Sequence, residues 1–201
     1  LEKIGVIDKI QFDIDEVGQP LNFRWGKCKL ATTSFGHGIT TTPLQLAKAY
    51  SIISNGGYDI NPSLVKSGKS KIRTQILNEN VSKNINNILR KVVSSKEGTA
   101  HFADVYGYEV GGKTGTADKV KNGIYTKDKI NTFVSVFPIS NPKFVLLVLL
   151  DEPKPSKEYI YHYRDERTPY KGNWRNTAGW TTVLIVGNII EKIGPILATK
   201  Y

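Results

Sequence analysis

The first helical pattern of apolar and polar positions begins near Thr42. Thr42 as N-cap, Pro43 at the first helical position and Gln45 three residues after the cap form a capping box. The apolar positions that follow share one helical face: Leu46, Ala49, Tyr50 and Ile53. Because Gly56-Gly57 is a helix-ending signal, we predict a helix over residues 42–57.

A second and stronger helical pattern covers residues 78–97. Asn78 is a favourable N-cap residue, and Gly98 marks the end of the pattern. The apolar positions recur at helical spacing: Val81, Ile85, Ile88, Leu89 and Val92. They predict the face that packs on the core, so Ser82 is expected on the outer face, pointing to solvent.

After Gly98 the pattern changes to short extended runs within a sheet expected over residues 107–151. Three runs are predicted strands: 108–116, 131–137 and 144–150. Residues 138–142 form a short turn, so the last two strands should pair antiparallel. An amphipathic closing helix is expected over 181–193, whereas residues 1–30 have the features of an irregular connecting segment. This order of elements predicts an α+β fold, with helices packed on an antiparallel sheet.

Composition adds few constraints. The chain has 201 residues, of which 39% are hydrophobic and 23% charged, as in soluble globular proteins. Because Cys28 is the single cysteine, the chain can form no internal disulfide. The longest apolar run, Phe144 to Leu150, is too short to span a bilayer. The three histidines have no metal-ligand spacing, so they are expected to be ordinary structural or surface residues. The chain begins at Leu1 and contains no methionine, which we interpret as a fragment or a processed product.

The net charge of +10 favours anionic polymers as partners. The basic residues are dispersed, however, and the densest run has no interleaved aromatic residues for base stacking: Lys66, Lys69, Lys71 and Arg73. We therefore predict no nucleic-acid binding. An aromatic cluster follows the last strand and is interpreted as loop packing under the closing helix: Tyr159, Tyr161, Tyr163, Tyr170, Trp174 and Trp180.

The stretch from Gly107 to Thr116 concentrates the chemistry and has two incompatible interpretations. In the first, four residues match the phosphate-loop pattern G-x-x-x-x-G-K-[ST]: Gly107, Gly112, Lys113 and Thr114. Such a loop must open a helix whose N-terminal amides hold the phosphates. Residues 115–123 contain two glycines and no apolar stripe, which argues against a helix there and against a nucleotide-hydrolysing enzyme.

In the second interpretation, Lys113-Thr114-Gly115-Thr116 is the K-T-G strand of a serine acyl-transfer enzyme of the penicillin-recognising type. An ammonium and a hydroxyl on an exposed strand can hold a substrate carboxylate by charge-assisted hydrogen bonds. The glycine leaves room for a substrate backbone. An N–H group of the same strand can stabilise a tetrahedral oxyanion.

The surrounding motifs favour the second interpretation, because in order and content the chain resembles class B penicillin-binding proteins from about residue 25 onward. The matching segments are Ser34-Phe-Gly-His-Gly-Ile39, Thr42-Pro-Leu-Gln-Leu-Ala47, Ser54-Asn-Gly-Gly57, Glu97-Gly-Thr-Ala100, Gly111-Gly-Lys-Thr-Gly-Thr-Ala117, Asp151-Glu-Pro153 and Thr177-Ala-Gly-Trp180. The last of them is most similar to the septal, cell-division transpeptidases of Gram-negative bacteria (FtsI type). The resemblance implies the penicillin-recognising fold, present here as its C-terminal part.

The resemblance also implies an activity and residue roles. In the family, a serine attacks the D-Ala-D-Ala end of a peptidoglycan stem peptide and passes the acyl group to a second stem, and β-lactams acylate the same serine. Lys113 would belong to the active-site hydrogen-bond network. Thr114 and Thr116 would contact the substrate carboxylate, the Thr116 N–H would form half of the oxyanion hole, and Gly115 would keep the strand open.

The nucleophilic serine is expected outside this chain. Ser63-Leu-Val-Lys66 matches S-x-x-K and Ser82-Lys-Asn84 matches S-x-N, but the family places the nucleophile at the start of a helix. A third match, Ser140-Asn-Pro-Lys143, falls in a turn. In the family, both true motifs precede the segment that here starts at Phe35. We therefore expect them upstream of Leu1, which would leave the fragment inactive.

The family also implies partners and a location, and it implies that no metal or cofactor is needed. The expected partners are peptidoglycan stem peptides or their lipid-linked precursor polymer, β-lactams, and cell-division proteins such as the divisome glycosyltransferase. The expected location is a periplasmic domain of a protein anchored in the inner membrane. Two alternatives stay open: a P-loop NTPase using residues 107–114, and a non-catalytic wall-binding module on the same fold.

Overall fold

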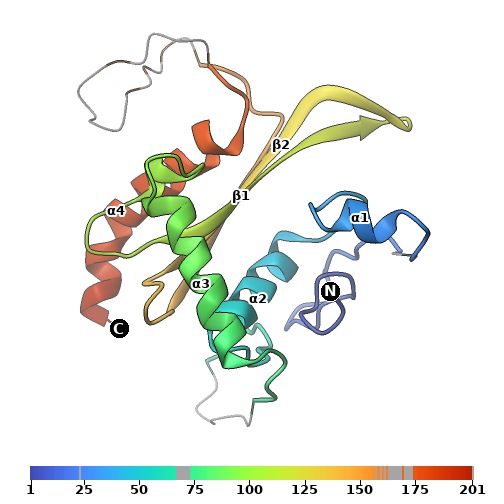
Figure 1. The fold of residues 1–201 in the computed structure, drawn as a ribbon, viewed down its shortest axis with the longest axis horizontal. Coiled ribbons are helices and arrows are strands. Elements are labelled where there is room, and N and C mark those ends of the chain that lie inside the picture. The colour runs from blue at the N-terminus through green and yellow to red at the C-terminus, as the bar shows by residue number, and fades with distance from the viewer. Residues whose placement is uncertain are drawn as a thin grey trace. The chain divides into compact units, whose positions relative to one another are not determined.

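The chain forms two compact units, Leu1–Ile85 and Asn86–Tyr201, whose helices and strands are shown in Figure 1. The computed structural model describes residues 1–22, 24–66, 73–156, 158, 160, 162, 169 and 174–200. Six residues named above lie outside this described part: Lys69, Lys71, Tyr159, Tyr161, Tyr163 and Tyr170.

The first unit contains α1 (Lys29–Thr33) and α2 (Pro43–Ser54). The predicted capping box is confirmed, because the Gln45 N–H donates to Thr42 Oγ1 at 3.2 Å and the Thr42 N–H donates to Gln45 Oε1 at 2.9 Å. The Gln45 amide also donates to the carbonyl oxygens of Gly5 and Asp8. Together with the buried Val6, these bonds pack the irregular N-terminal segment against α2.

Ser82 corrects the sequence-based expectation for α3 (Glu79–Ser94). Its side chain is 2% exposed instead of pointing to solvent. The hydroxyl donates to the Ile53 carbonyl at 2.5 Å and accepts from the Gly56 N–H at 3.1 Å. Ser82 therefore satisfies two backbone groups that the end of α2 leaves open.

The face of α3 that packs also differs from the predicted one. Val81 and Ile88 are 45% and 60% exposed, whereas Leu89 and Val93 are buried. The cap is as expected, because Asn78 Oδ1 accepts from the Asn80 N–H at 2.8 Å. The periodicity of apolar residues predicted the helix correctly. The set of residues that is buried in the folded chain, however, lies on a somewhat different face of the helix from the predicted set.

The second unit is built on an antiparallel sheet with strand order β1-β2-β3. The strands are β1 (Gly111–Lys121), β2 (Ile124–Phe137) and β3 (Phe144–Asp151). The predicted antiparallel pairing of the last two is confirmed, with Phe137 opposite Phe144. The first two extend beyond their predicted bounds because Asn122-Gly123, both at positive φ, joins them in a tight hairpin.

Short helices and α4 (Thr182–Lys200) complete the second unit, which confirms the α+β class. The one-turn helices are η1 (His101–Ala103) and η2 (Ala178–Trp180). The buried core is formed by residues of α3, β2 and α4 together with residues in and around η1 and just before β1: Val93, Ala100, Ala103, Val110, Phe133, Phe137, Val183, Val186 and Ile190.

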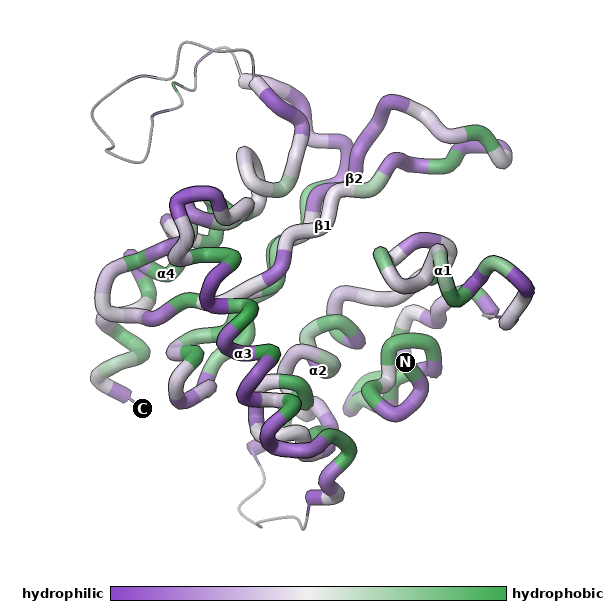
Figure 2. Tube along the Cα trace, in the orientation of Figure 1, coloured by the Kyte–Doolittle hydropathy of each residue, from purple (hydrophilic) through white to green (hydrophobic). Residues whose placement is uncertain are grey.

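The closing helix continues past Gly194-Pro195, where the sequence predicted its end. A Cβ at position 194 would lie 2.3 Å from the Tyr108 ring, so glycine there serves close packing. Leu197, one turn later, still packs against the core. By length and composition, residues Ala178–Lys200 could cross a membrane, but α4 places Val186 and Ile190 in the core of this unit. Figure 2 shows the hydropathy of the residues along α4.

Candidate active-site strand

The predicted site residues Lys113, Thr114, Gly115 and Thr116 all lie on β1. Within the described part of the chain, β1 pairs with β2 on one side and forms an edge of the sheet on the other. Lys113, Gly115 and Thr116 are exposed, and Thr114 is half-buried. Because an edge strand presents unpaired backbone groups, this segment is open to pairing with an extended ligand.

The space available for a side chain differs between two glycines of this strand, Gly112 and Gly115. A Cβ at Gly112 would lie 2.5 Å from the Val134 carbonyl oxygen and 2.6 Å from the Phe133 ring, so packing excludes a side chain there. A Cβ at Gly115 would meet nothing closer than the Thr132 carbonyl oxygen at 3.9 Å, an ordinary contact. The internal packing of the chain therefore does not require glycine at 115.

Hydrogen bonds hold the side chains of Lys113, Thr114 and Thr116 in place. Lys113 Nζ donates to the Thr114 carbonyl at 2.6 Å. The Thr114 hydroxyl lies 3.0 Å from the Thr99 hydroxyl, and the Thr116 hydroxyl accepts from the Ala178 N–H at 3.0 Å. Since side chains two residues apart lie on the same face of a strand, both threonines project to the face that also carries Thr99 and Ala178.

Arg90 fixes the entry to β1 and was not singled out from the sequence. Its Nη1 donates to Asp104 Oδ1 and to the Val110 carbonyl, both at 2.8 Å. The bonds join α3 to the residue that immediately precedes β1. A lone arginine in an amphipathic helix carries no sequence signal for such a role, because its partners lie 14 and 20 residues away.

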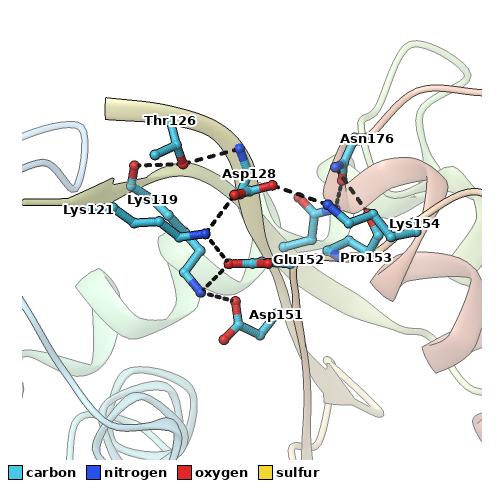
Figure 3. Close-up of polar contacts among 10 residues, drawn as sticks. Lys119, Lys121, Thr126, Asp128, Asp151, Glu152, Pro153, Lys154 and Asn176 are labelled. Carbon is cyan, nitrogen blue, oxygen red and sulfur yellow. Dashed lines mark hydrogen bonds and ion pairs between the residues drawn. The ribbon is translucent and has the colours of Figure 1, made fainter. Parts of the chain in front are cut away.

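The outer end of β1 is held by a network of partly exposed charged side chains (Figure 3). Lys119 bonds Asp151 at 2.8 Å and Glu152 at 2.9 Å, and Lys121 bonds Glu152 at 3.0 Å. Asp128 bridges two lysines: Lys121 at 2.9 Å and Lys154 at 3.1 Å.

These bonds shift the pKa values of their members in the directions that favour the charged forms. Hydrogen bonds from Lys119 and Lys121 lower the pKa of Glu152. Hydrogen bonds from Lys121 and Lys154 lower the pKa of Asp128. The hydrogen bonds to Asp151 and Glu152 raise the pKa of Lys119, and those to Asp128 and Glu152 raise the pKa of Lys121.

The phosphate-loop alternative is wrong. Lys113 is the third residue of β1, and the strand continues to Lys121, so the motif lies within a strand and opens no helix. Without a helix N-terminus, its amides cannot form the anion cradle that the pattern requires.

The serines that matched family motifs do not present a nucleophile. Ser63 lies outside any helix, and its hydroxyl donates to Asp13 Oδ2 at 2.7 Å. Ser82 is buried between backbone groups, as described above. Ser140 lies in the turn between β2 and β3 and donates to the Glu109 carboxylate. Among the described residues, no cluster of three or more histidine, cysteine or acidic side chains forms a metal site.

Comparisons with known proteins agree with the geometry. The family model for the penicillin binding protein transpeptidase domain matches residues 3–168. A probable peptidoglycan D,D-transpeptidase FtsI of Caulobacter vibrioides is 32% identical over 98% of this chain and 33% of its own length. Stage V sporulation protein D of Bacillus subtilis is 32% identical over 100% of this chain and 30% of its own length.

A solved structure gives the same result. The transpeptidase domain of Burkholderia pseudomallei penicillin-binding protein 3 superimposes with a TM-score of 0.75 at 26% identity, covering 96% of this chain and 55% of that one. The chain spans about a third of the length of the curated relatives named above. It belongs to the penicillin-binding protein transpeptidase family.

Proposed function

We propose that this chain supplies the substrate-binding strand of a peptidoglycan D,D-transpeptidase, which cross-links stem peptides by serine acyl transfer at D-Ala-D-Ala. The observation that carries the proposal is the Lys113-Thr114-Gly115-Thr116 tetrad, largely exposed on an edge strand of a transpeptidase-family chain. A stem peptide or a β-lactam would lie along this edge and pair with it as an added strand.

Each residue of the tetrad has a role in the proposal. The Lys113 ammonium belongs to the hydrogen-bond network of the site and favours an anionic ligand. The hydroxyls of Thr114 and Thr116 bind the substrate carboxylate. The Thr116 N–H stabilises the oxyanion of the tetrahedral intermediate. The glycine at 115, which internal packing does not demand, leaves space for the ligand backbone.

The nucleophile belongs to polypeptide outside residues 1–201 in this proposal. Acyl transfer needs a serine activated by a nearby base, such as a lysine one helical turn away. Ser63 is not at the start of a helix, and the hydroxyls of Ser82 and Ser140 bond backbone groups and Glu109, respectively. Residues 1–201 alone are therefore expected to form no acyl-enzyme.

The biological setting is proposed from the relatives. Several are named FtsI, so we infer a role in septal cross-linking during cell division, with the domain in the periplasm and an anchor in the inner membrane. The inferred partners are stem peptides or their lipid-linked precursor polymer and a divisome glycosyltransferase. A fluorescent fusion to the full-length protein should gather at division sites. Uniform labelling of the cell envelope would contradict the septal role.

The decisive experiment is acylation of the full-length protein by a fluorescent penicillin, followed by peptide mapping of the adduct by mass spectrometry. An adduct on a serine outside residues 1–201 is the expected result. An adduct on Ser63 would overturn our assignment of the nucleophile. A folded protein without any adduct would overturn the transpeptidase proposal and favour a non-catalytic wall-binding module.

A further inference from the structure

A buried polar side chain, Asn131, lies behind the candidate active-site strand. It sits on β2 directly opposite Thr116 and is 0% exposed. Its Nδ2 donates to Asn176 Oδ1 at 2.8 Å and to the Thr181 hydroxyl at 3.0 Å. Its Oδ1 has no hydrogen-bond partner among the described residues. A buried carbonyl oxygen without a partner costs stability. What Asn131 contributes to the structure is therefore its two donated hydrogen bonds.

The direction of these bonds is fixed by the next partners. Asn176 Nδ2 donates to the Pro153 carbonyl at 3.3 Å, which leaves Asn176 Oδ1 as the acceptor for Asn131. The Thr181 hydroxyl donates to the Thr177 carbonyl at 2.9 Å, so it too accepts from Asn131. The Asn131 amide therefore acts as a double donor, and the 176–181 segment is tied to the sheet at both of its ends.

The same segment reaches the candidate active-site strand. The Ala178 N–H, in the middle of the segment, donates to the Thr116 hydroxyl at 3.0 Å. A Cβ at Gly179 would lie 2.7 Å from the Thr99 carbonyl oxygen, so the segment also packs against the residue that meets Thr114. A shift of this segment would change the surroundings of both threonine hydroxyls.

We propose that Asn131 is a positioning residue that sets the direction in which the Thr116 hydroxyl donates its proton. The inference rests on the proposed function and deepens it. A threonine hydroxyl has one proton and two acceptor lone pairs. Once the Ala178 N–H occupies one lone pair, the hydroxyl keeps its proton for an outside acceptor, and the proposed acceptor is the ligand carboxylate. Asn131 holds Ala178 in place through Asn176 and Thr181.

The test is a double-mutant cycle on acylation of the full-length protein by benzylpenicillin, which carries the carboxylate. Asn131→Ala should lower the second-order acylation rate by about tenfold, the scale of one charge-assisted hydrogen bond, through weaker binding and not through a slower acylation step. In a Thr116→Val background, the same substitution should cost less than about threefold, because the hydroxyl through which it acts is absent. Equal losses in both backgrounds would overturn the proposal.

Control variants separate positioning from folding. Ser135→Ala removes another buried hydroxyl of β2, which donates to the Leu146 carbonyl on β3 at 3.0 Å, on the side of β2 away from β1. It should lower the melting temperature and leave the acylation rate within about twofold of wild type. An acylation loss in Ser135→Ala as large as that in Asn131→Ala would mean a general structural effect and would overturn the proposal.

A second variant covers a failure to fold. If Asn131→Ala does not fold, Asn176→Ala, at a half-buried position shortly before η2, replaces it in the same cycle with the same expected coupling. Additive losses with Thr116→Val would then refute the proposal. The wild-type protein provides the remaining distinction: no acylation of wild type defeats the proposed function, whereas acylation without coupling defeats this inference alone.

Discussion

The inner and outer halves of β1 are attached to the second unit by different means. In the inner half, residues 111–116, Gly112 lies against Phe133, and the hydroxyls of Thr114 and Thr116 meet neutral partners. In the outer half, residues 117–121, two lysine side chains reach the carboxylates of neighbouring strand ends (Figure 3). One strand thus combines close packing with neutral hydrogen bonds at one end and partly exposed ion pairs at the other.

The two kinds of attachment respond differently to solution conditions. Exposed ion pairs are screened by salt and individually contribute little to stability. Close packing and bonds between neutral groups do not depend on the ionisation of a side chain. The half of β1 that carries the motif is therefore held in the same geometry over a wider range of pH and salt than the half beyond it.

The largest expected effect is on activity, at the inner half. Lys113→Ala in the full-length protein should lower the rate of penicillin acylation by about 10²-fold or more, as for loss of a side chain that takes part in proton transfer or charge stabilisation. The measurement is the acylation rate with a fluorescent penicillin. Lys127→Ala, an exposed lysine on β2, is the matched control and should behave as wild type. Unchanged acylation in Lys113→Ala would remove this residue from the site.

The next effect is on stability and tests the packing of the inner half. Gly112→Ala should destabilise the protein by about 1–3 kcal/mol, because the new Cβ overlaps the Val134 carbonyl and the Phe133 ring. Denaturant unfolding gives the free energy of unfolding. A variant as stable as wild type would show that the inner half is not held by close packing at this point.

Gly115→Ala is the matched substitution three residues later and should separate function from stability. Its Cβ has ordinary contacts only, so the free energy of unfolding should stay within about 0.5 kcal/mol of wild type. Acylation should fall by about tenfold, because the added methyl group would crowd a ligand backbone that lies along this strand edge. If acylation is unaffected while stability drops, the glycine serves the fold and the comparison with Gly112 fails.

The smallest effect is expected at the outer half, where Glu152→Gln removes a carboxylate shared by two lysines. Amide hydrogen exchange of residues 117–121 should become faster in this variant and also in wild type at 1 M salt. Residues 111–116 should not change in either case. Equal acceleration in both halves would show that the charge network supports the whole strand.

The pH dependence of the outer half follows from the lowered carboxyl pKa values. Because the folded-state pKa of Glu152 lies below its ordinary 4.5, its contribution is present above pH 4.5 and is lost as the pH falls through the lowered value. On the basic side, the raised pKa of Lys121 keeps its contribution intact below its ordinary 10.5. The exchange difference between wild type and Glu152→Gln should therefore be constant near neutrality and shrink in acid. A difference that persists at pH 2 would exclude an ionic origin.

Prediction from the sequence succeeded where the signal was local. The capping box of α2 involves residues three apart, and the pairing of β2 with β3 was predicted from the short turn at residues 138–142, where the structure has a connection of residues 138–143. The tetrad at 113–116 was predicted to lie on a strand, and it does. The chemistry proposed for the tetrad depends on its residue types, which the sequence gives directly. The exposure of its strand depends on the position of that strand at the edge of the sheet, which the sequence does not give.

Prediction from the sequence failed where contacts with residues distant in the chain determine the local structure. The Ser82 hydroxyl bonds a carbonyl 29 residues away, so its helical position alone gave the wrong environment. Gly194-Pro195 has the composition of a helix end, but the close approach of Tyr108 and the core contact of Leu197 keep α4 continuous there. The Asn122-Gly123 turn is a case of the opposite kind, because its hairpin signal was present in the sequence and was missed.

The sequence by itself determined the family, the α+β class and the identity of the tetrad, since these depend on residue types and on spacings of a few residues. Only the tertiary structure decided which face of α3 is buried, why Gly112 and Gly115 differ, and that Asn131 contacts a segment 45 residues later. The physical reason is that hydrogen bonds and close packing act over a few ångströms in space. The partners that the folded chain brings within that distance are not encoded in any local stretch of the sequence.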